Sequence, residues 1–220
     1  MIPIILALIF FGFAAVALPW DKIHERLFSK RVVVLGARGV GKTTMNTFLA
    51  SGSLPQEYKQ TIAPEPTKAR RFELRDLKLS IARSFDVSGD ASAYATWKDN
   101  VDAADLVLYL VRADELIAND FSAGNRAIDD LTHIGGWIAN RKSPPMFFIV
   151  GTHCDLDPNF ASLTPDKRGH YADAFQNSWW VSKLVDLGGG TQRVKVALGS
   201  MRTIEDTEAL VFAIFAQVGA

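Results

Sequence analysis

Residues 31–43 read RVVVLGARGVGKT. Their first half, 31–36, is a β-branched apolar run that ends at a glycine, which predicts a buried strand. Residues 36–43 match the pattern G-x-x-x-x-G-K-[ST], and 42–50 carry a helical pattern. In this strand–loop–helix context, main-chain N–H groups can surround phosphates and the positive end of the helix can face them. The alternative is a glycine loop without a ligand.

The residues of this loop are expected to bind the phosphates of a nucleotide and Mg²⁺. Lys42 is expected to reach the β- and γ-phosphates, and the Thr43 hydroxyl is expected to ligate Mg²⁺. The residues predicted to contact the nucleotide are Arg38, Gly39, Val40, Gly41, Lys42, Thr43 and Thr44.

Strand and helix patterns alternate along the rest of the chain. We expect an α/β fold, with a mostly parallel six-stranded sheet, one antiparallel strand pair and helices on both faces, as in P-loop NTPases. The expected strands are 31–36, the antiparallel pair 67–75 and 78–87, then 105–112, 145–151 and 193–199. The expected helices are 42–50, about 119–141, 164 to about 185, and 203–218.

The N-terminal stretch 2–20 contains no charged residue and ends at Trp20. As a helix it would be about 28 Å long, close to the hydrocarbon thickness of a bilayer. Lysines and arginines follow it and none precedes it, which predicts a single-pass anchor with the rest of the chain in the cytoplasm. A cleaved signal peptide and a core helix are the alternatives. The predicted organisation is an anchor at 1–20, a juxtamembrane linker or helix at 21–30, and one domain at 31–220.

Composition excludes several other classes. The 220 residues hold 24 Lys and Arg against 24 Asp and Glu, so a basic surface for nucleic acid is not expected. One cysteine, Cys154, excludes an intramolecular disulfide framework and a cysteine-rich zinc site. The pair Asp129-Asp130 is expected on a solvated face, and the pair Trp179-Trp180 is expected to pack.

Later segments extend the phosphate-loop match. Thr61 follows the loop, DVSG at 86–89 ends a predicted strand, THCD at 152–155 follows another, and GSM at 199–201 precedes the last predicted helix. Together with GARGVGKT, these segments resemble the Ras superfamily of small GTPases, and more closely its Arf-like branch. Trp97 stands at a spacing from Asp86 that is typical of that branch.

The resemblance implies a role for each segment. Thr61 would be the switch I threonine that joins Mg²⁺, Asp86 would hold a Mg²⁺-bound water, and the Gly89 N–H would contact the γ-phosphate. Asp155 would accept hydrogen bonds from guanine N1 and N2, which rejects adenine. Thr152, His153, Gly199, Ser200 and Met201 would complete the nucleoside site, with the Ser200 N–H facing guanine O6.

Four positions depart from the family pattern. Asp90 stands where the catalytic glutamine is expected, so hydrolysis should be slow or use another residue. Arg38 occupies a loop position that usually holds a small residue, where it is either an arginine finger in cis or a solvated side chain. His153 replaces a lysine, and Gly199-Ser200-Met201 matches S-A-K loosely.

The resulting hypothesis is a membrane-anchored GTP/GDP switch that uses Mg²⁺ and hydrolyses GTP. The expected catalytic residues are Lys42, Thr61, Gly89, Asp90 and Arg38. A protein effector would bind the switch regions near Thr61 and Gly89. In layout the chain resembles the signal recognition particle receptor β-subunit family. A GTP-loaded scaffold with little hydrolysis and a P-loop ATPase or kinase are the alternatives.

Overall fold

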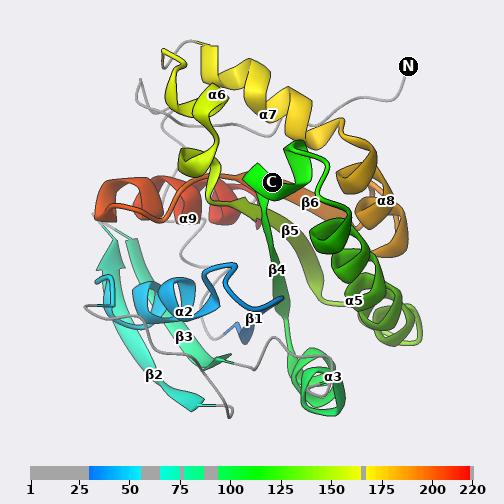
Figure 1. Cartoon of the computed structure of the whole chain (residues 1–220). Coiled ribbons are helices and arrows are strands. Elements are labelled where there is room, and N and C mark those ends of the chain that lie inside the picture. Colours follow the sequence, from blue (N-terminus) through cyan, green and yellow to red (C-terminus); the bar gives the residue numbers. More distant parts are fainter. Residues whose placement is uncertain (1–29, 56–64, 75–76, 87–93, 165–166, 219–220) are drawn as a thin grey trace.

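Strand β1 (Val32–Gly36) forms where the sequence predicts it, and all of its residues are buried. In the computed structural model (Figure 1), β1 lies inside a six-stranded sheet of order β2-β3-β1-β4-β5-β6. The structure describes residues 30–55, 65–74, 77–86, 94–164 and 167–218, with the main chain alone for 65–74 and 77–86. The other strands are β2 (Glu65–Leu74), β3 (Leu77–Asp86), β4 (Leu106–Arg112), β5 (Met146–Thr152) and β6 (Val194–Leu198).

The centre of the sheet is parallel, which confirms an α/β fold. Neighbouring strands among β1, β4, β5 and β6 all pair in parallel. Strand β3 runs parallel to β1 through the pair Val34↔Asp86, and β2 pairs with β3 in antiparallel fashion. Because the carboxyl ends of parallel strands share one edge of a sheet, the loops that follow β1, β4, β5 and β6 meet there.

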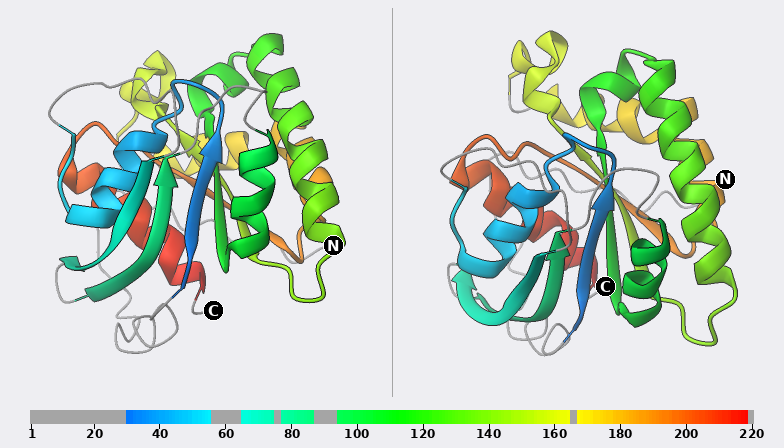
Figure 2. Two further views of the ribbon diagram at one scale, coloured as in Figure 1. Left: turned by 90° about the horizontal axis from the view of Figure 1, so that it is seen from below. Right: turned by 60° about the horizontal axis from the view of Figure 1, so that its bottom comes forward.

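Helices cover both faces of this sheet (Figure 2). Helices α2 (Lys42–Ser51) and α9 (Ile204–Val218) lie on one face, and α3 (Tyr94–Ala103), α5 (Phe121–Ala139) and α8 (Trp179–Leu187) lie on the other. The shorter elements are α4 (Ala113–Ile117), the 3₁₀ turn η2 (Cys154–Leu156), α6 (Pro158–Ala161) and α7 (Arg168–Gln176).

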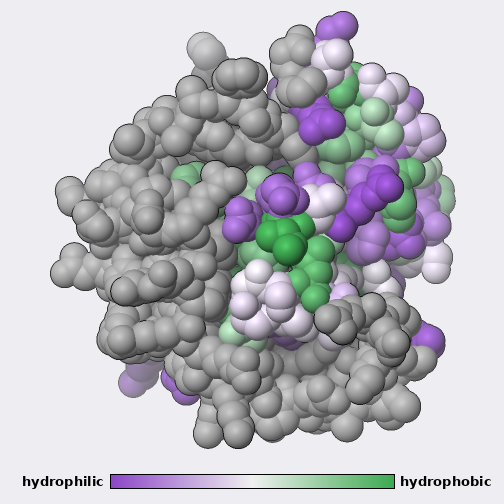
Figure 3. Space-filling model, turned by 90° about the vertical axis from the view of Figure 1, so that its left-hand side faces the viewer, coloured by the Kyte–Doolittle hydropathy of each residue, from purple (hydrophilic) through white to green (hydrophobic). Residues whose placement is uncertain are grey.

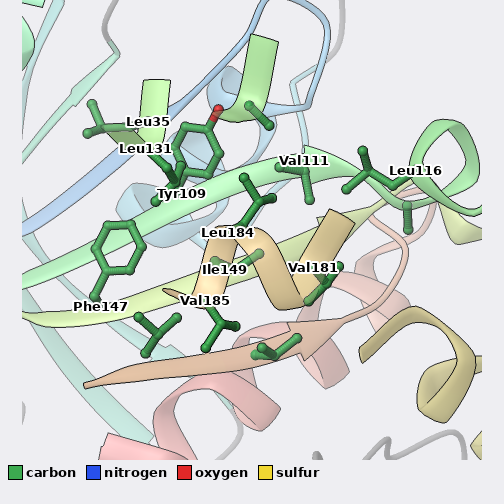
Figure 4. Packing of buried hydrophobic residues seen from close by; sticks show 14 of the residues in the cluster. Leu35, Tyr109, Val111, Leu116, Leu131, Phe147, Ile149, Val181, Leu184 and Val185 are labelled. Carbon is green, nitrogen blue, oxygen red and sulfur yellow. The ribbon is translucent and has the colours of Figure 1, made fainter. Parts of the chain in front are cut away.

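Side-chain alternation along the strands divides the core in two. Val32 and Val34 pack with α2 and α9, whereas Val33 and Leu35 pack with the helices of the opposite face. Figure 4 shows the second cluster, in which side chains from β4 and β5 meet those of α5 and α8. Burying one such aliphatic side chain stabilises the fold by about 1.5–3 kcal/mol. In the space-filling view from the side of β2 and α9, hydrophobic residues of the described surface gather near the centre, with hydrophilic residues above them and to their right (Figure 3).

The helix predicted from 164 to about 185 is two helices. Helix α7 ends at Gln176, and α8 begins after Ser178, whose extended backbone and hydroxyl cap the new helix by accepting from the Val181 N–H at 3.3 Å. The prediction was wrong here because a cap inside a periodic pattern starts a new helix without disturbing the pattern. Helix α3 was not predicted at all. Helix α5 starts where the Asp120 carboxylate accepts from the N–H groups of Ser122 and Ala123.

In each of the pairs Trp179-Trp180 and Asp129-Asp130, one residue lies in the core and the other lies on the surface. Trp180 is 3% exposed and Trp179 is 65% exposed, so the packing prediction holds for Trp180 alone. Asp129 is exposed, but Asp130 is fully buried, which overturns the expectation of a solvated pair. Asp130 sits on the sheet-facing side of α5, where hydrogen bonds from other side chains compensate its burial.

In the described part of the chain, no helix has the length and apolar character needed to cross a membrane. The predicted anchor at 1–20 and residues 21–29 of the predicted linker lie outside the described residues. The membrane segment therefore stays a prediction.

Candidate functional site

The phosphate loop connects β1 to α2 at the carboxyl edge of the sheet. Three of its glycines have positive φ angles, 139° at Gly36, 85° at Gly39 and 92° at Gly41. At Gly36 a Cβ would stand 2.4 Å from the main-chain oxygen of Leu110, so a side chain there would have to displace strand β4. These angles and this close approach account for glycine at the loop.

The loop ends at the amino terminus of α2. Gly41 is the residue before the helix, and no side chain caps it. The first N–H groups of a helix have no partner within the helix, so this end is suited to an anion. Lys42 is 8% exposed, and its ammonium donates a 2.8 Å hydrogen bond to the Ala37 carbonyl oxygen across the loop. A fixed cation and a helix amino terminus therefore share one small loop.

The remaining loop side chains differ in exposure. Val40 is buried, Thr43 and Thr44 are half-buried, and Arg38 is exposed. An exposed Arg38 agrees with the solvated reading of this side chain more than with a finger that points into the loop.

Thr152, at the end of β5, joins this loop to the segment THCD. Its hydroxyl oxygen lies 3.0 Å from the Val40 carbonyl oxygen, 112 residues away in sequence. The same oxygen lies 3.0 Å from the Val111 carbonyl oxygen and 2.8 Å from His153 Nδ1. Thr152 is fully buried. A buried side chain thus holds the end of β5 against the phosphate loop and the end of β4.

His153 lies beside the phosphate loop. It adopts a left-handed backbone conformation with φ 59°, and its Cε1 atom lies 3.7 Å from the place where a Cβ on Gly41 would stand. Burial, and then the charge of Arg112, lower the pKa of His153. The next residue, Cys154, is fully buried, and burial raises the pKa of its thiol to about 12, which makes it unreactive.

The two aspartates of this segment have different surroundings. Asp157 is 7% exposed and caps α6 by accepting from the Asn159 N–H, and it also accepts from the Tyr171 hydroxyl. Asp155 lies in η2 and is half-buried. Its carboxylate forms no hydrogen bond or ion pair with the residues that the structure describes. The capping role belongs to Asp157, so capping does not explain Asp155.

The third segment, 199–201, reaches the same place from β6. The Gly199 N–H donates to the Gly151 carbonyl oxygen at 3.0 Å, and Ser200 is 2% exposed, with a hydroxyl that accepts from the Arg202 N–H. A Cβ on Gly41 would stand only 2.3 Å from the Met201 methyl group. The loose sequence match at 199–201 therefore still places a side chain, Met201, against the phosphate loop.

Arg112 belongs to this neighbourhood and was missed in the sequence. It ends β4 opposite Thr152 in the sheet register. Its guanidinium pairs with Asp114 at 2.5 Å and with Glu115 at 3.1 Å, and the bond to Asp114 raises the pKa of Arg112. The charge of Asp155 contributes in the same direction. A charged residue at the carboxyl end of an otherwise apolar strand was the available signal.

Several predicted residues cannot be placed. Thr61, Gly89 and Asp90 lie outside the described residues, and of Asp86 only the main chain is described, at the end of β3 beside β1. Of the three residues predicted to hold Mg²⁺ directly or through water, the structure describes the side chain of Thr43 alone. Among the described residues, no three His, Cys, Asp or Glu side chains group as a metal site.

The described part of the site is thus a glycine loop with geometry suited to an anion and a carboxylate on a neighbouring turn. No model of a known protein family matches the chain.

Proposed function

We propose that the chain is a membrane-anchored small GTPase, a P-loop protein that binds GTP and GDP and changes its partner surface with the nucleotide. The observation that carries this proposal is the contact between Thr152 and Val40. It brings the segment with Asp155 beside a glycine loop that has a lysine and a helix amino terminus. A loop suited to phosphate and a carboxylate that could read a purine would thereby belong to one site, which supports a guanine-nucleotide site.

The nucleotide would be bound at both ends. Main-chain N–H groups between Gly36 and Thr43 and the Lys42 ammonium would hold the phosphates. The Asp155 carboxylate would accept from guanine N1 and N2, and His153 and Met201 would flank the nucleoside. Adenine has no 2-amino donor, so the Asp155 carboxylate would stay unpaired against it.

Hydrolysis would be slow. Water would attack the γ-phosphate to give GDP and phosphate, with Lys42 and the Gly89 N–H stabilising charge on the phosphate oxygens. Asp90 is shorter than glutamine and is charged, so it would orient the attacking water poorly. Mg²⁺ would be held by Thr43, by Thr61 and, through a bound water, by Asp86, and it would neutralise phosphate charge.

The switch would act at a membrane. Residues 1–20 would anchor the chain, with the domain in the cytoplasm, and the segments around Thr61 and Gly89 would offer a protein effector different surfaces in the GTP and GDP states. The second candidate is a GTP-loaded scaffold that hydrolyses little. Asp90 and the exposure of Arg38 favour it.

Nucleotide competition on the detergent-solubilised full-length protein tests the proposal. A fluorescent GDP analogue should bind saturably with Mg²⁺ present, and GTP should displace it while ATP should not. Lys42→Ala should abolish binding, and the exposed control Lys183→Ala should leave it unchanged. Equal displacement by ATP would instead identify an adenine-nucleotide enzyme. Single-turnover GTP hydrolysis, with and without partners, separates the switch from the scaffold.

A further inference from the structure

The hydroxyl of Thr152 has three possible hydrogen-bond acceptors beside it, but it can donate to only one of them. A threonine hydroxyl carries one proton and two acceptor lone pairs. Three atoms surround it, the carbonyl oxygens of Val40 and Val111, both at 3.0 Å, and His153 Nδ1 at 2.8 Å. The carbonyl oxygens can only accept. Thr152 is fully buried, so solvent water does not supply the missing donor.

The number of protons available in this cluster indicates which ring nitrogen of His153 is protonated. If the hydroxyl donated to Nδ1, both carbonyl oxygens would face its lone pairs at 3.0 Å without a proton between them. If Nδ1 donates to the hydroxyl, the hydroxyl proton is free for a carbonyl oxygen, and only one unprotonated contact remains. The second arrangement has one more hydrogen bond in a buried site, where an unmade bond is costly.

This assignment determines what the imidazole offers to a ligand. With the proton on Nδ1, a neutral ring leaves Nε2 as an acceptor. The ring edge at Cε1 faces Gly41 of the phosphate loop. Among the described residues, the charged groups that act on the ring are Arg112, Asp114 and Asp155, and the effects of burial and Arg112 oppose its protonation. A lysine in this place would offer a charged donor instead.

We propose that Thr152 is a positioning residue that holds His153 as its neutral Nδ1–H tautomer against Gly41, so that an uncharged imidazole forms one wall of the nucleoside pocket. The tautomer of His153 is inferred from contacts within the protein and does not depend on the identity of the ligand. Its effect on nucleotide release rests on the proposed function, because the ligand concerned is GDP.

The matched variants are Thr152→Val, which removes the hydroxyl and keeps the shape, and Thr152→Ser, which keeps the hydroxyl. Two-bond ¹H–¹⁵N spectra of the full-length, histidine-labelled protein in detergent report the tautomer, and His153→Gln assigns the His153 signals. Wild type and Thr152→Ser should show a protonated Nδ1, and Thr152→Val should shift His153 toward Nε2–H. GDP release should be about tenfold faster in Thr152→Val than in Thr152→Ser.

A wild-type spectrum with His153 protonated on Nε2 would overturn the proposal, as would equal GDP release rates in the two variants. If Thr152→Val does not fold, the His153 tautomer measured in wild type and in Thr152→Ser still tests the proposal. A wild type that carries Nδ1–H but binds no guanine nucleotide would support the positioning role and refute the proposed function, so the two failures are distinguishable.

Discussion

Gly135 of α5 lies against the main chain of Leu187, so closely that a Cβ on Gly135 would stand 2.0 Å from the Leu187 carbonyl oxygen. Leu187 is the last residue of α8. The next residue along α5, Gly136, has nothing within 4 Å of such a Cβ. The first glycine sets how closely the two helices approach, and the second does not.

Alanine substitutions at these adjacent positions should therefore have opposite signs. Gly135→Ala should lower the free energy of unfolding by about 1–3 kcal/mol, because main-chain atoms must move apart. Gly136→Ala should raise it by about 0.5–1 kcal/mol through helix propensity. Chemical unfolding followed by tryptophan fluorescence measures both, and changes of the same sign would contradict the packing described for α5 and α8.

Asp130 should be a main determinant of stability on the same helix. Its buried carboxylate accepts from the Tyr94 hydroxyl at 2.6 Å, the Tyr109 hydroxyl at 2.8 Å and Arg126 Nε at 2.9 Å. Asp130→Ala should cost about 3 kcal/mol of unfolding free energy, since it leaves these donors without their acceptor. Asp129→Ala, at an exposed position, should change it by less than about 0.5 kcal/mol. Equal effects of the two substitutions in unfolding experiments would show that Asp130 is not buried as described.

The same contacts predict an alkaline loss of stability. Burial and the bond to Asp130 raise the pKa of Tyr94 to about 12, and burial raises that of Tyr109 well above 10. Each folded pKa exceeds the unfolded value, so this stabilisation is complete below about pH 10 and disappears as the pH rises through the folded values. The melting temperature should fall from about pH 10 upward, and less steeply in Tyr94→Phe. A profile identical in both proteins would rule out a contribution from Tyr94.

The apolar runs were sufficient to predict β1, β4 and β5, because strands buried on both faces read as continuous hydrophobic stretches. They did not reveal α3, or the cap at Ser178 inside a periodic helix pattern. Asp130 looked like half of a solvated pair, because its partners Tyr94 and Tyr109 come from elements far away in sequence. Such tertiary compensation of a buried charge leaves no local signal.

In the site, the loop 36–43 and the segments at 152–155 and 199–201 were predicted, and the structure brings all three together through contacts with Val40 and Gly41. Arg112 was missed because its importance depends on the register between β4 and β5. The roles assigned to Thr61, Gly89 and Asp90 remain predictions, since these residues lie outside the described part of the chain.

The base-reading role of Asp155 is tested most directly by replacing a hydrogen-bond acceptor of its side chain with a donor. A carboxylate accepts from both guanine N1 and the 2-amino group. The side-chain amide of an Asp155→Asn protein would instead present an N–H donor to the 2-oxo group of xanthine. The measurement is the affinity of full-length wild type and Asp155→Asn for GDP, xanthosine diphosphate and ADP, by displacement of fluorescent GDP or its xanthosine counterpart.

Wild type should bind GDP best. Asp155→Asn should lose roughly 100-fold in GDP affinity and gain affinity for xanthosine diphosphate, with ADP weak in both. If Asp155→Asn kept the wild-type order of the three nucleotides, or if wild type bound ADP as tightly as GDP, a guanine site built on the phosphate loop and Asp155 would be contradicted.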